Sequence, residues 1–493
     1  MKKPVVIMAT SNGVGAGHLI RTSAIARELD FYARPILFSM ANLALEVSDQ
    51  LEIECEFVPG RDKDWMQRWR WDRYLRDRLI ALIDETGAKV VTFDGVVPYP
   101  GILAAKFRRP ETSLVWIRRG MWRTQPQGMA LNLQSKLMDY IIEPGDLADA
   151  YDNGPTKNRE DAVKTSPVTH YTRQNSVEKG RARRFLGLDS KRLTVLVQLG
   201  IGESDMNTRV KTVLLALSEI ENVQVVMTRE PRDKSNQSLA PKELDIKIIK
   251  HFPLVDLLPA FDAVICASGY NSVHEVLPAA IPTLFIPNIR GTDDQLARAK
   301  WCADMGLALI ADEDNLNQIS RKVRDLMNPK IRRTLEKNCR RVPEMHGARE
   351  IAEIIRVLLN ENVTSLVLKR IRHKRILAQS AFERGIGGLI RRGLNLLLRL
   401  AAIAFRILFP HHPFGNKQNS SPILMSSGIQ ESKRTLKRGD RLESLIQTAS
   451  TKYISERIEI ARRAYRVPVE KIQLKKVKGT VESIALNSSS KSA

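Results

Sequence analysis

The sequence predicts an α/β protein made of two Rossmann-like halves. Short apolar runs alternate with longer segments of helical periodicity, a pattern typical of parallel sheets covered by helices. This pattern begins at residues 4–9 (PVVIMA) and begins again at residues 193–199 (LTVLVQL), each time with a glycine-containing loop directly after the strand. The repeated start indicates two similar domains with parallel sheets rather than one large sheet.

The expected domain boundaries follow changes in composition. A polar stretch with turn residues at about 150–165 predicts the linker between a first domain at residues 1–155 and a second at 166–362. Helical segments from about residue 316 to 360 are expected to cross back and brace the first domain. Residues 363–415 form a basic segment, 416–440 a linker, and 441–493 a small basic helical extension to which we assign no function.

The charge of the chain is concentrated in its last quarter. The 493 residues carry a net charge of +23, of which residues 363–493 contribute +18 and residues 1–362 only +5. Such basic tails bind anionic membranes or nucleic acid, but this one lacks interleaved aromatics or a nucleic-acid-binding module, so nucleic acid is not the expected partner. The N-terminus has the pattern of a first strand rather than of a signal peptide.

Residues 386–409 (IGGLIRRGLNLLLRLAAIAFRILF) predict an amphipathic helix at a membrane surface. At helical spacing its polar residues share one face and its large apolar residues the other. A membrane-spanning helix would place Arg399 near the middle of the bilayer, at a cost of about 2.5–3.5 kcal/mol. A helix in the head-group plane keeps the arginines wet, so we expect a peripheral contact. Packing of the same helix on the protein's own core is the alternative.

The first domain opens with a glycine loop after its first strand, TSNGVGAGHLIR. It contains Gly13, Gly15 and Gly17, followed by His18 and Arg21. The spacing is not that of an NAD-binding loop, and no acid is placed to hold an NAD ribose. A second candidate in this domain is Asp94, at the carboxyl end of the strand KVVTF, where α/β sheets place their ligands. Asp94 is therefore a candidate for catalysis or acceptor binding, and capping of the next turn is the alternative.

The second domain carries the most informative stretch, residues 264–301. A strand ends at Cys266, a turn of small residues follows, and a helix begins near Asn271. This arrangement presents backbone N–H groups at the carboxyl end of a strand, where phosphates bind. Glu275, one turn into that helix, is placed to reach hydroxyls on whatever the phosphates carry. After the first strand of this domain, Gly200 and Gly202 would allow the backbone to approach a phosphate closely.

This stretch resembles the donor site of the GT-B glycosyltransferases, in the branch that includes the lipid II-forming N-acetylglucosaminyltransferase and the monogalactosyldiacylglycerol synthases, which share the family 28 C-terminal domain. The resemblance spans residues 4–360 and implies two domains facing a cleft. It implies that Ser268, Gly269 and Asn271 bind the diphosphate and that Glu275 holds the ribose. It further implies that Phe252 lies against uracil and that the pair Asp294-Gln295 reads the sugar, while the glycine loop with His18 faces the acceptor.

The resemblance implies an inverting transferase that takes a hexose or N-acetylhexosamine from a UDP-sugar, with no cofactor and no catalytic metal. We recognise no Asp-x-Asp motif of the metal-dependent type, and Asp293 and Asp294 do not match that motif because they are adjacent. His18 is the leading candidate for the general base, because an imidazole suits deprotonation of a hydroxyl at neutral pH. Asp94 is the second candidate for the base. Orientation of a phosphate alone is the other role open to His18.

The partners expected are a nucleotide sugar, a lipid or lipid-linked acceptor and an anionic membrane, at the cytoplasmic face of the plasma membrane. The helix WMQRWRWDRYLRDRLIALIDETG either packs its tryptophans on the sheet or presents them, with its arginines, to lipid head groups. Arg118, Arg119 and Arg123 either grip an acceptor phosphate or form a solvated basic turn. A UDP-sugar 2-epimerase and a non-enzymatic nucleotide-sugar-binding scaffold remain the rival functions.

Overall fold

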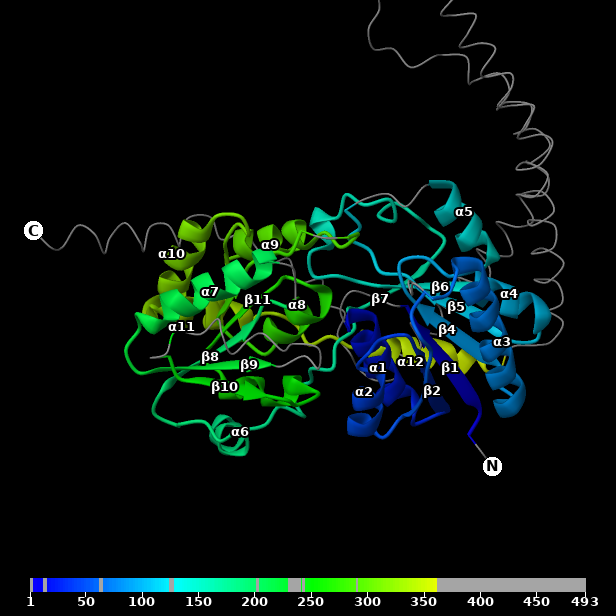
Figure 1. Cartoon of the computed structure of the whole chain (residues 1–493), viewed down its shortest axis with the longest axis horizontal. Helices are drawn as coiled ribbons and strands as arrows, with labels where there is room; N and C mark the ends of the chain where they lie inside the picture. Colours follow the sequence, from blue (N-terminus) through cyan, green and yellow to red (C-terminus); the bar gives the residue numbers. More distant parts are fainter. Residues whose placement is uncertain are drawn as a thin grey trace, which may run out of the picture.

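Two lobes of similar construction lie side by side in the computed structural model (Figure 1). The structure describes residues 3–11, 16–61, 65–123, 128–200, 204–228, 241, 244–289 and 291–360. The basic segment 363–415 with its amphipathic helix, the linker 416–440 and the extension 441–493 therefore lie outside the described residues. No helix in the described ranges combines the length and the apolar character that crossing a bilayer requires.

The first lobe is a seven-stranded sheet in which all neighbouring strands are parallel, in the order β3-β2-β1-β4-β5-β6-β7. Its central strands are buried apolar runs, as expected for a sheet covered on both faces. The strands are β1 (Val5–Thr10), β2 (Arg34–Ser39), β3 (Glu54–Phe57), β4 (Val90–Asp94), β5 (Ser113–Ile117), β6 (Tyr140–Pro144) and β7 (Val163–Thr165). The helices are α1 (Gly17–Leu29), α2 (Ala44–Leu51), α3 (Arg68–Thr86), α4 (Pro100–Arg108) and α5 (Gly128–Leu137), with a 3₁₀ turn η1 (Asp149–Tyr151).

The second lobe repeats the plan with six parallel strands in the order β10-β9-β8-β11-β12-β13. These are β8 (Leu193–Gln198), β9 (Val223–Thr228), β10 (Ile246–Ile249), β11 (Ala263–Cys266), β12 (Thr283–Phe285) and β13 (Leu309–Ile310). Its helices are α6 (Lys179–Leu186), α7 (Ser204–Ser218), α8 (Tyr270–Val276), α9 (Gln295–Asp304), α10 (Leu316–Met327) and α11 (Pro329–Cys339), with a 3₁₀ helix η3 (Leu254–Ala260). The predicted α/β class with two Rossmann-like parallel-sheet domains is confirmed.

The chain leaves the first lobe later than the composition suggested, and it returns at the end. Strand β7 belongs to the first sheet and reaches Thr165, past the expected boundary at residue 155. The last described helix, α12 (Gly347–Leu358), packs on the first lobe, where Ile351 and Ile355 share a core with Leu19 and Leu29 of α1 (Figure 1). The two lobes are therefore joined by two chain crossings, which restricts how far they separate.

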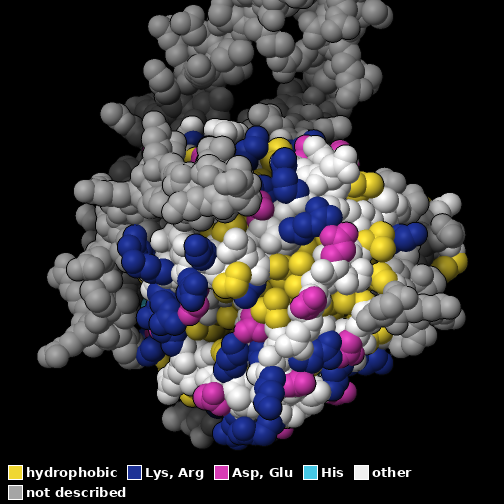
Figure 2. Space-filling view, turned by 90° about the vertical axis from the view of Figure 1, so that its left-hand side faces the viewer, with side chains coloured by type: hydrophobic (Ala, Val, Ile, Leu, Met, Phe, Trp, Pro, Cys, Tyr) yellow, Lys and Arg dark blue, Asp and Glu magenta, His cyan; other side chains and the backbone are white. Residues whose placement is uncertain are grey.

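The outer face of the second lobe carries charges of both signs, with hydrophobic side chains gathered in its middle (Figure 2). Lysines and arginines alternate there with acids rather than forming one basic field. This agrees with the near balance of charge in residues 1–362.

The tryptophans of α3 divide between core and surface. Trp71 is fully buried and packs edge-on against Tyr99, with 5.0 Å between ring centroids. Trp65 and Trp69 are instead 68% and 55% exposed, so packing on the sheet accounts for only one of the three rings. The guanidinium groups of Arg70 and Arg73 lie 5.2 Å and 5.5 Å from the centroid of the Trp69 ring.

Candidate active site

The sheet order of the first lobe brings the two candidate bases together. Strands β1 and β4 are neighbours, and Thr10 at the end of β1 is in register with Asp94 at the end of β4. Helix α1 begins at Gly17, so His18 and Arg21 lie on its first turn, beside the same sheet edge. His18 Nδ1 lies 2.6 Å from Asp94 Oδ1, and Arg21 Nε donates to Asp94 Oδ2 at 2.8 Å. His18 and Asp94, considered as alternatives from the sequence, form one hydrogen-bonded pair.

The surroundings of this pair favour an ionised aspartate and a neutral histidine. Burial raises the pKa of the Asp94 carboxyl, but the Arg21 guanidinium and His18 outweigh burial and hold that pKa below its usual value. Burial also lowers the pKa of His18 below its usual value, although the hydrogen bond to Asp94 opposes this. An ionised Asp94 accepts a hydrogen bond from the N–H of His18 Nδ1, which leaves Nε2 as the nitrogen that can accept a proton. The His18 side chain is still 14% exposed, so part of it is accessible to solvent.

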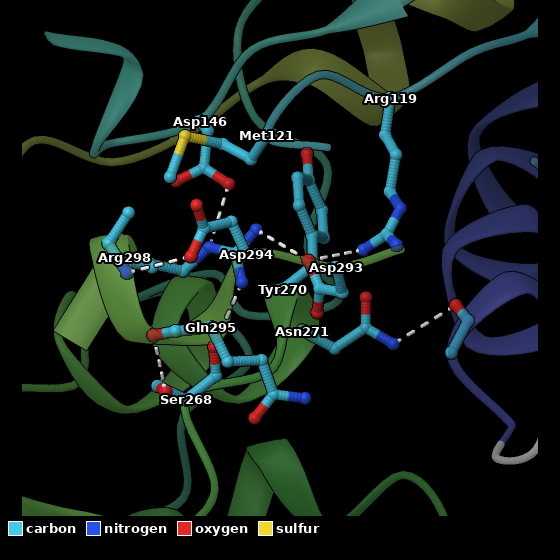
Figure 3. Close-up of polar contacts among 12 residues, drawn as sticks. Arg119, Met121, Asp146, Ser268, Tyr270, Asn271, Asp293, Asp294, Gln295 and Arg298 are labelled. Carbon is cyan, nitrogen blue, oxygen red and sulfur yellow. Dashed lines mark hydrogen bonds and ion pairs between the residues drawn. The ribbon is translucent and has the colours of Figure 1, made fainter. Parts of the chain in front are cut away.

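The small-residue turn of the second lobe faces this pair. Ser268 is buried, and its hydroxyl donates to the carbonyl of Gln295 at 2.8 Å. Gly269 is the N-cap residue of α8, a helix of only seven residues. The side-chain amide of Asn271 crosses between the lobes and donates to the carbonyl of Gly17 at 3.1 Å (Figure 3). The turn and the start of α1 are thus in direct contact.

Tyr270 links helices α1 and α8, which meet at this junction of the lobes. Tyr270 begins α8, and its ring lies 5.0 Å from the Arg21 guanidinium carbon. Its hydroxyl donates to the carbonyl of Gly145 and accepts from the N–H of Val168, both at 2.9 Å. Arg21 therefore touches Asp94 on one side and the second lobe on the other.

Glu275 lies on α8, half-buried beside η3 and the end of β11. Burial, together with the negative charge of Asp256, raises the pKa of the Glu275 carboxyl to about 8. A carboxyl in this state gains from hydroxyl donors that would stabilise its ionised form. The ribose contact expected for Glu275 stays a prediction.

Phe252 packs edge-on against His170, with 5.7 Å between ring centroids, and contacts the core shared by α1 and α12. Gly200 has a φ of +87°, which glycine adopts without strain, directly after β8. Gly13, Gly15 and Gly202 lie outside the described residues. The roles predicted for Phe252 and Gly200 remain predictions.

Asp294 and Gln295 stand at the start of α9 and are held by local hydrogen bonds. The Asp294 carboxylate caps the helix by accepting from the N–H of Ala297 at 3.0 Å. Gln295 Oε1 accepts from the N–H of Asn288 at 2.9 Å. The preceding residue, Asp293, is the shared acid of two arginines: it lies 3.0 Å from Arg298 Nη2 and 2.6 Å from Arg119 Nη1 (Figure 3).

A profile of the glycosyltransferase family 28 C-terminal domain matches residues 194–354. The match runs from β8 into α12, and we call the matched part of the second lobe the family 28 domain. All the expected donor-site residues from Gly200 to Gln295 lie within the matched span of the family 28 domain. No three His, Cys, Asp or Glu side chains among the described residues are grouped as a metal site.

Two curated relatives carry the name UDP-N-acetylglucosamine–N-acetylmuramyl-(pentapeptide) pyrophosphoryl-undecaprenol N-acetylglucosamine transferase. The one from Nocardioides sp. is 28% identical over 145 residues, which is 29% of this chain and 40% of the relative. The one from Saccharopolyspora erythraea is 26% identical over 241 residues, 48% of this chain and 60% of the relative. This chain therefore matches only about half the length of these relatives.

Among solved structures, the spinosyn forosaminyltransferase has a TM-score of 0.52 and 14% sequence identity, with 73% of this chain and 100% of that chain covered. At this identity the likeness concerns the fold alone. It places the two-lobed arrangement around the family 28 domain among the GT-B folds that the sequence predicted.

Sequence reasoning did not predict the ion pairs that Arg118, Arg119 and Arg298 form. Arg118 and Arg119 do not form a solvated turn: Arg118 is fully buried and pairs with Asp161 at 2.7 Å, and Arg119 crosses to the family 28 domain. Arg298 is also fully buried and pairs with Asp146 at 2.8 Å. The sequence around Arg298 does not predict this burial, because only the tertiary fold brings the first lobe against that face of the polar helix α9.

Proposed function

We propose that this protein is a glycosyltransferase that moves a hexose or N-acetylhexosamine from a UDP-sugar to a lipid-linked acceptor. The observation that carries the proposal is the placement of a family 28 domain directly against the His18–Asp94 pair, with Asn271 touching Gly17 at the contact. The relatives named for a UDP-N-acetylglucosamine donor and an undecaprenol-linked acceptor support both substrate classes. The second lobe binds the nucleotide, and the first lobe binds the acceptor.

In the proposed reaction, the acceptor hydroxyl gives its proton to His18 Nε2 while its oxygen attacks the anomeric carbon of the sugar. The bond from that carbon to the diphosphate oxygen breaks, and UDP leaves with the bonding pair. A single displacement of this kind inverts the anomeric configuration. Asp94 fixes the His18 tautomer through Nδ1 and stabilises the imidazolium as it forms.

The diphosphate charge is met by fixed groups of the family 28 domain. Hydrogen-bond donors for the diphosphate come from backbone N–H groups at the turn Ser268–Gly269 and at Gly200. In this proposal no catalytic metal is needed. Glu275 accepts hydrogen bonds from the ribose hydroxyls, and Asp294 with Gln295 reads the sugar. No cofactor beyond the sugar nucleotide takes part.

A membrane surface is the proposed setting of the reaction, on the cytoplasmic side. The exposed Trp65 and Trp69 lie at the start of α3 together with Arg70 and Arg73, a combination favoured at the boundary of water and lipid. Trp71 ties this end of α3 to Tyr99, in the loop that follows Asp94, so the exposed rings are near the acceptor side of the cleft. The basic segment 363–415 would add attraction to anionic lipid, at about 1 kcal/mol for each basic residue near the surface.

The deciding experiment is a product analysis with purified full-length protein. UDP-sugars are first screened for thermal stabilisation, and the best donor is then incubated with and without a polyprenyl-diphosphate-linked sugar. A glycosylated lipid and free UDP are expected only when the acceptor is present. Conversion of UDP-N-acetylglucosamine to its 2-epimer without acceptor would instead establish the epimerase. Full biological effect of the Glu275→Ala and His18→Ala proteins would point to the scaffold.

A further inference from the structure

The loop after β5 in the first lobe is paired with the loop before α9 in the second. The N–H of Arg123 donates to the carbonyl of Thr292 at 2.8 Å, and the N–H of Asp294 donates to the carbonyl of Met121 at 2.9 Å. Between them, Trp122 and Asp293 form an antiparallel bridge. Residues 121–123 and 292–294 thus form a short two-stranded ribbon, which contains Asp294 and directly precedes Gln295, the pair expected to read the sugar.

An ion pair fixes the register of this ribbon. Arg119 Nη1 lies 2.6 Å from Asp293 Oδ1, and the two side chains are only 11% and 15% exposed (Figure 3). Arg298 holds the same Asp293 oxygen at 3.0 Å while donating to the carbonyl of Ser268 at 2.9 Å. Asp293 is therefore clamped between an arginine of the first lobe and an arginine of the family 28 domain.

The positions of Asp294 and Gln295 are tied to the position of Asp293. Asp294 is held by its backbone to Met121 and by its side chain to the start of α9, and the carbonyl of Gln295 accepts from Ser268. A shift of Asp293 would move Asp294 and Gln295 against the diphosphate turn. The position of the sugar-reading pair thus depends on a guanidinium contributed by the other lobe.

We propose that Arg119 is a positioning residue that sets the selectivity of the donor site for the sugar, acting through Asp293 on Asp294 and Gln295. This inference rests on the proposed function, because it takes the second lobe to bind a UDP-sugar. It assigns sugar recognition jointly to both lobes, whereas the nucleotide is recognised by the second lobe alone.

The surroundings of Arg119 indicate that its removal leaves a folded protein. Without Arg119, Asp293 keeps its ion pair with Arg298, so no acid is left buried without a partner. Arg119 Nε is buried and has no hydrogen-bond partner among the described residues, and burial lowers the pKa of this side chain. Arg119→Gln therefore removes a positive charge that burial disfavours. Asp293→Asn would instead leave both Arg119 and Arg298 without their shared acid.

The test compares the affinities for UDP and for the best UDP-sugar, by calorimetry on full-length wild type, Arg119→Gln and Arg119→Lys. Arg324→Gln is the matched control, since it removes an exposed arginine of α10 that pairs with Glu219. We expect Arg119→Gln to bind UDP within about twofold of wild type and to lose on the order of tenfold in its preference for the UDP-sugar. Arg119→Lys should recover part of that preference, and the control should change neither affinity.

The same measurements separate the two proposals. An unchanged ratio of UDP-sugar to UDP affinity in Arg119→Gln would overturn the role of Arg119 and leave the proposed function intact. An equal loss for both ligands would also overturn it, because general disruption rather than sugar positioning would be the cause. Wild-type protein that binds neither ligand would overturn the proposed function itself, and the inference with it.

Discussion

The side-chain amide of Asn271 donates to the carbonyl of Gly17 across the junction of the lobes, although 254 residues separate them in the chain. Asn271 belongs to the turn expected to hold the donor diphosphate, and Gly17 precedes His18 on the first turn of α1. The contact brings the proposed leaving group and the proposed base to the same part of the cleft.

Replacing either member of the base pair should abolish transfer without abolishing donor binding. His18→Ala removes the proton acceptor, and Asp94→Asn favours the wrong tautomer of His18, so each should lower kcat by roughly 10²–10⁴-fold. Affinity for UDP should stay within a fewfold of wild type, because the nucleotide contacts lie in the second lobe. Initial rates and calorimetric titration measure the two effects separately, and loss of UDP binding in His18→Ala would argue against a division of roles between the lobes.

Arg21 should set the acid limb of the pH–rate profile. Wild-type activity is expected to fall as pH drops through the pKa of His18, which burial places below its usual value. The positive charge of Arg21 contributes to that lowering, so Arg21→Gln should move the acid limb to higher pH. The profile is measured at saturating donor on protein shown to be folded by its melting curve, and a limb that stays in place would remove Arg21 from this role.

Glu275 should make UDP binding depend on pH. With a pKa raised to about 8 by burial, a large share of Glu275 is protonated at neutral pH, and only the ionised carboxylate accepts both ribose hydroxyls. Affinity for UDP should therefore rise as pH increases through about 8, with release of protons on binding. Calorimetry in two buffers of different ionisation enthalpy detects those protons. Glu275→Gln should bind more weakly and show a flat pH dependence, and a sloping profile in that variant would assign the effect to another group.

A methyl group at Gly347 should loosen the return of the chain to the first lobe. A Cβ there would lie 2.0 Å from the carbonyl oxygen of Ser166, which is backbone and cannot rotate away. Gly347→Ala should therefore destabilise the protein by about 1–3 kcal/mol. Urea unfolding measures the change, and Arg349→Ala, an exposed position on the same helix, is the control. Equal stability of the two variants would show that α12 can shift at no cost.

The exposed rings of α3 should contribute to membrane binding independently of the tail. The double variant Trp65→Ser with Trp69→Ser should float less with phosphatidylglycerol vesicles than wild type, because two amphipathic rings leave the interface. Phe31→Ser is the matched control, since Phe31 is an exposed aromatic residue in the loop between α1 and β2. Equal flotation of full-length protein and of a chain ending at residue 362 would exclude the tail as an anchor.

The sequence was most informative where function depends on backbone geometry. Strands recognised as apolar runs, glycine turns and helix starts located His18, Asp94 and the Ser268–Gly269 turn, because each lies at a strand's carboxyl end in any parallel sheet. The direct bond between His18 and Asp94 depends on β1 and β4 being neighbours, and the strand order is not written in local patterns. The roles of Arg119 and Arg298 were not predicted for a related reason: an arginine in a polar segment becomes a buried clamp only when another lobe covers it.

The most direct test of the account is a crystal structure of the protein soaked with UDP. We expect the diphosphate at the turn Ser268–Gly269 beside Gly200, with the Glu275 carboxylate within hydrogen-bonding distance of the ribose hydroxyls and His18 facing the site from the other lobe. An empty cleft at saturating UDP, or a Glu275 side chain directed away from a bound ribose, would contradict the account.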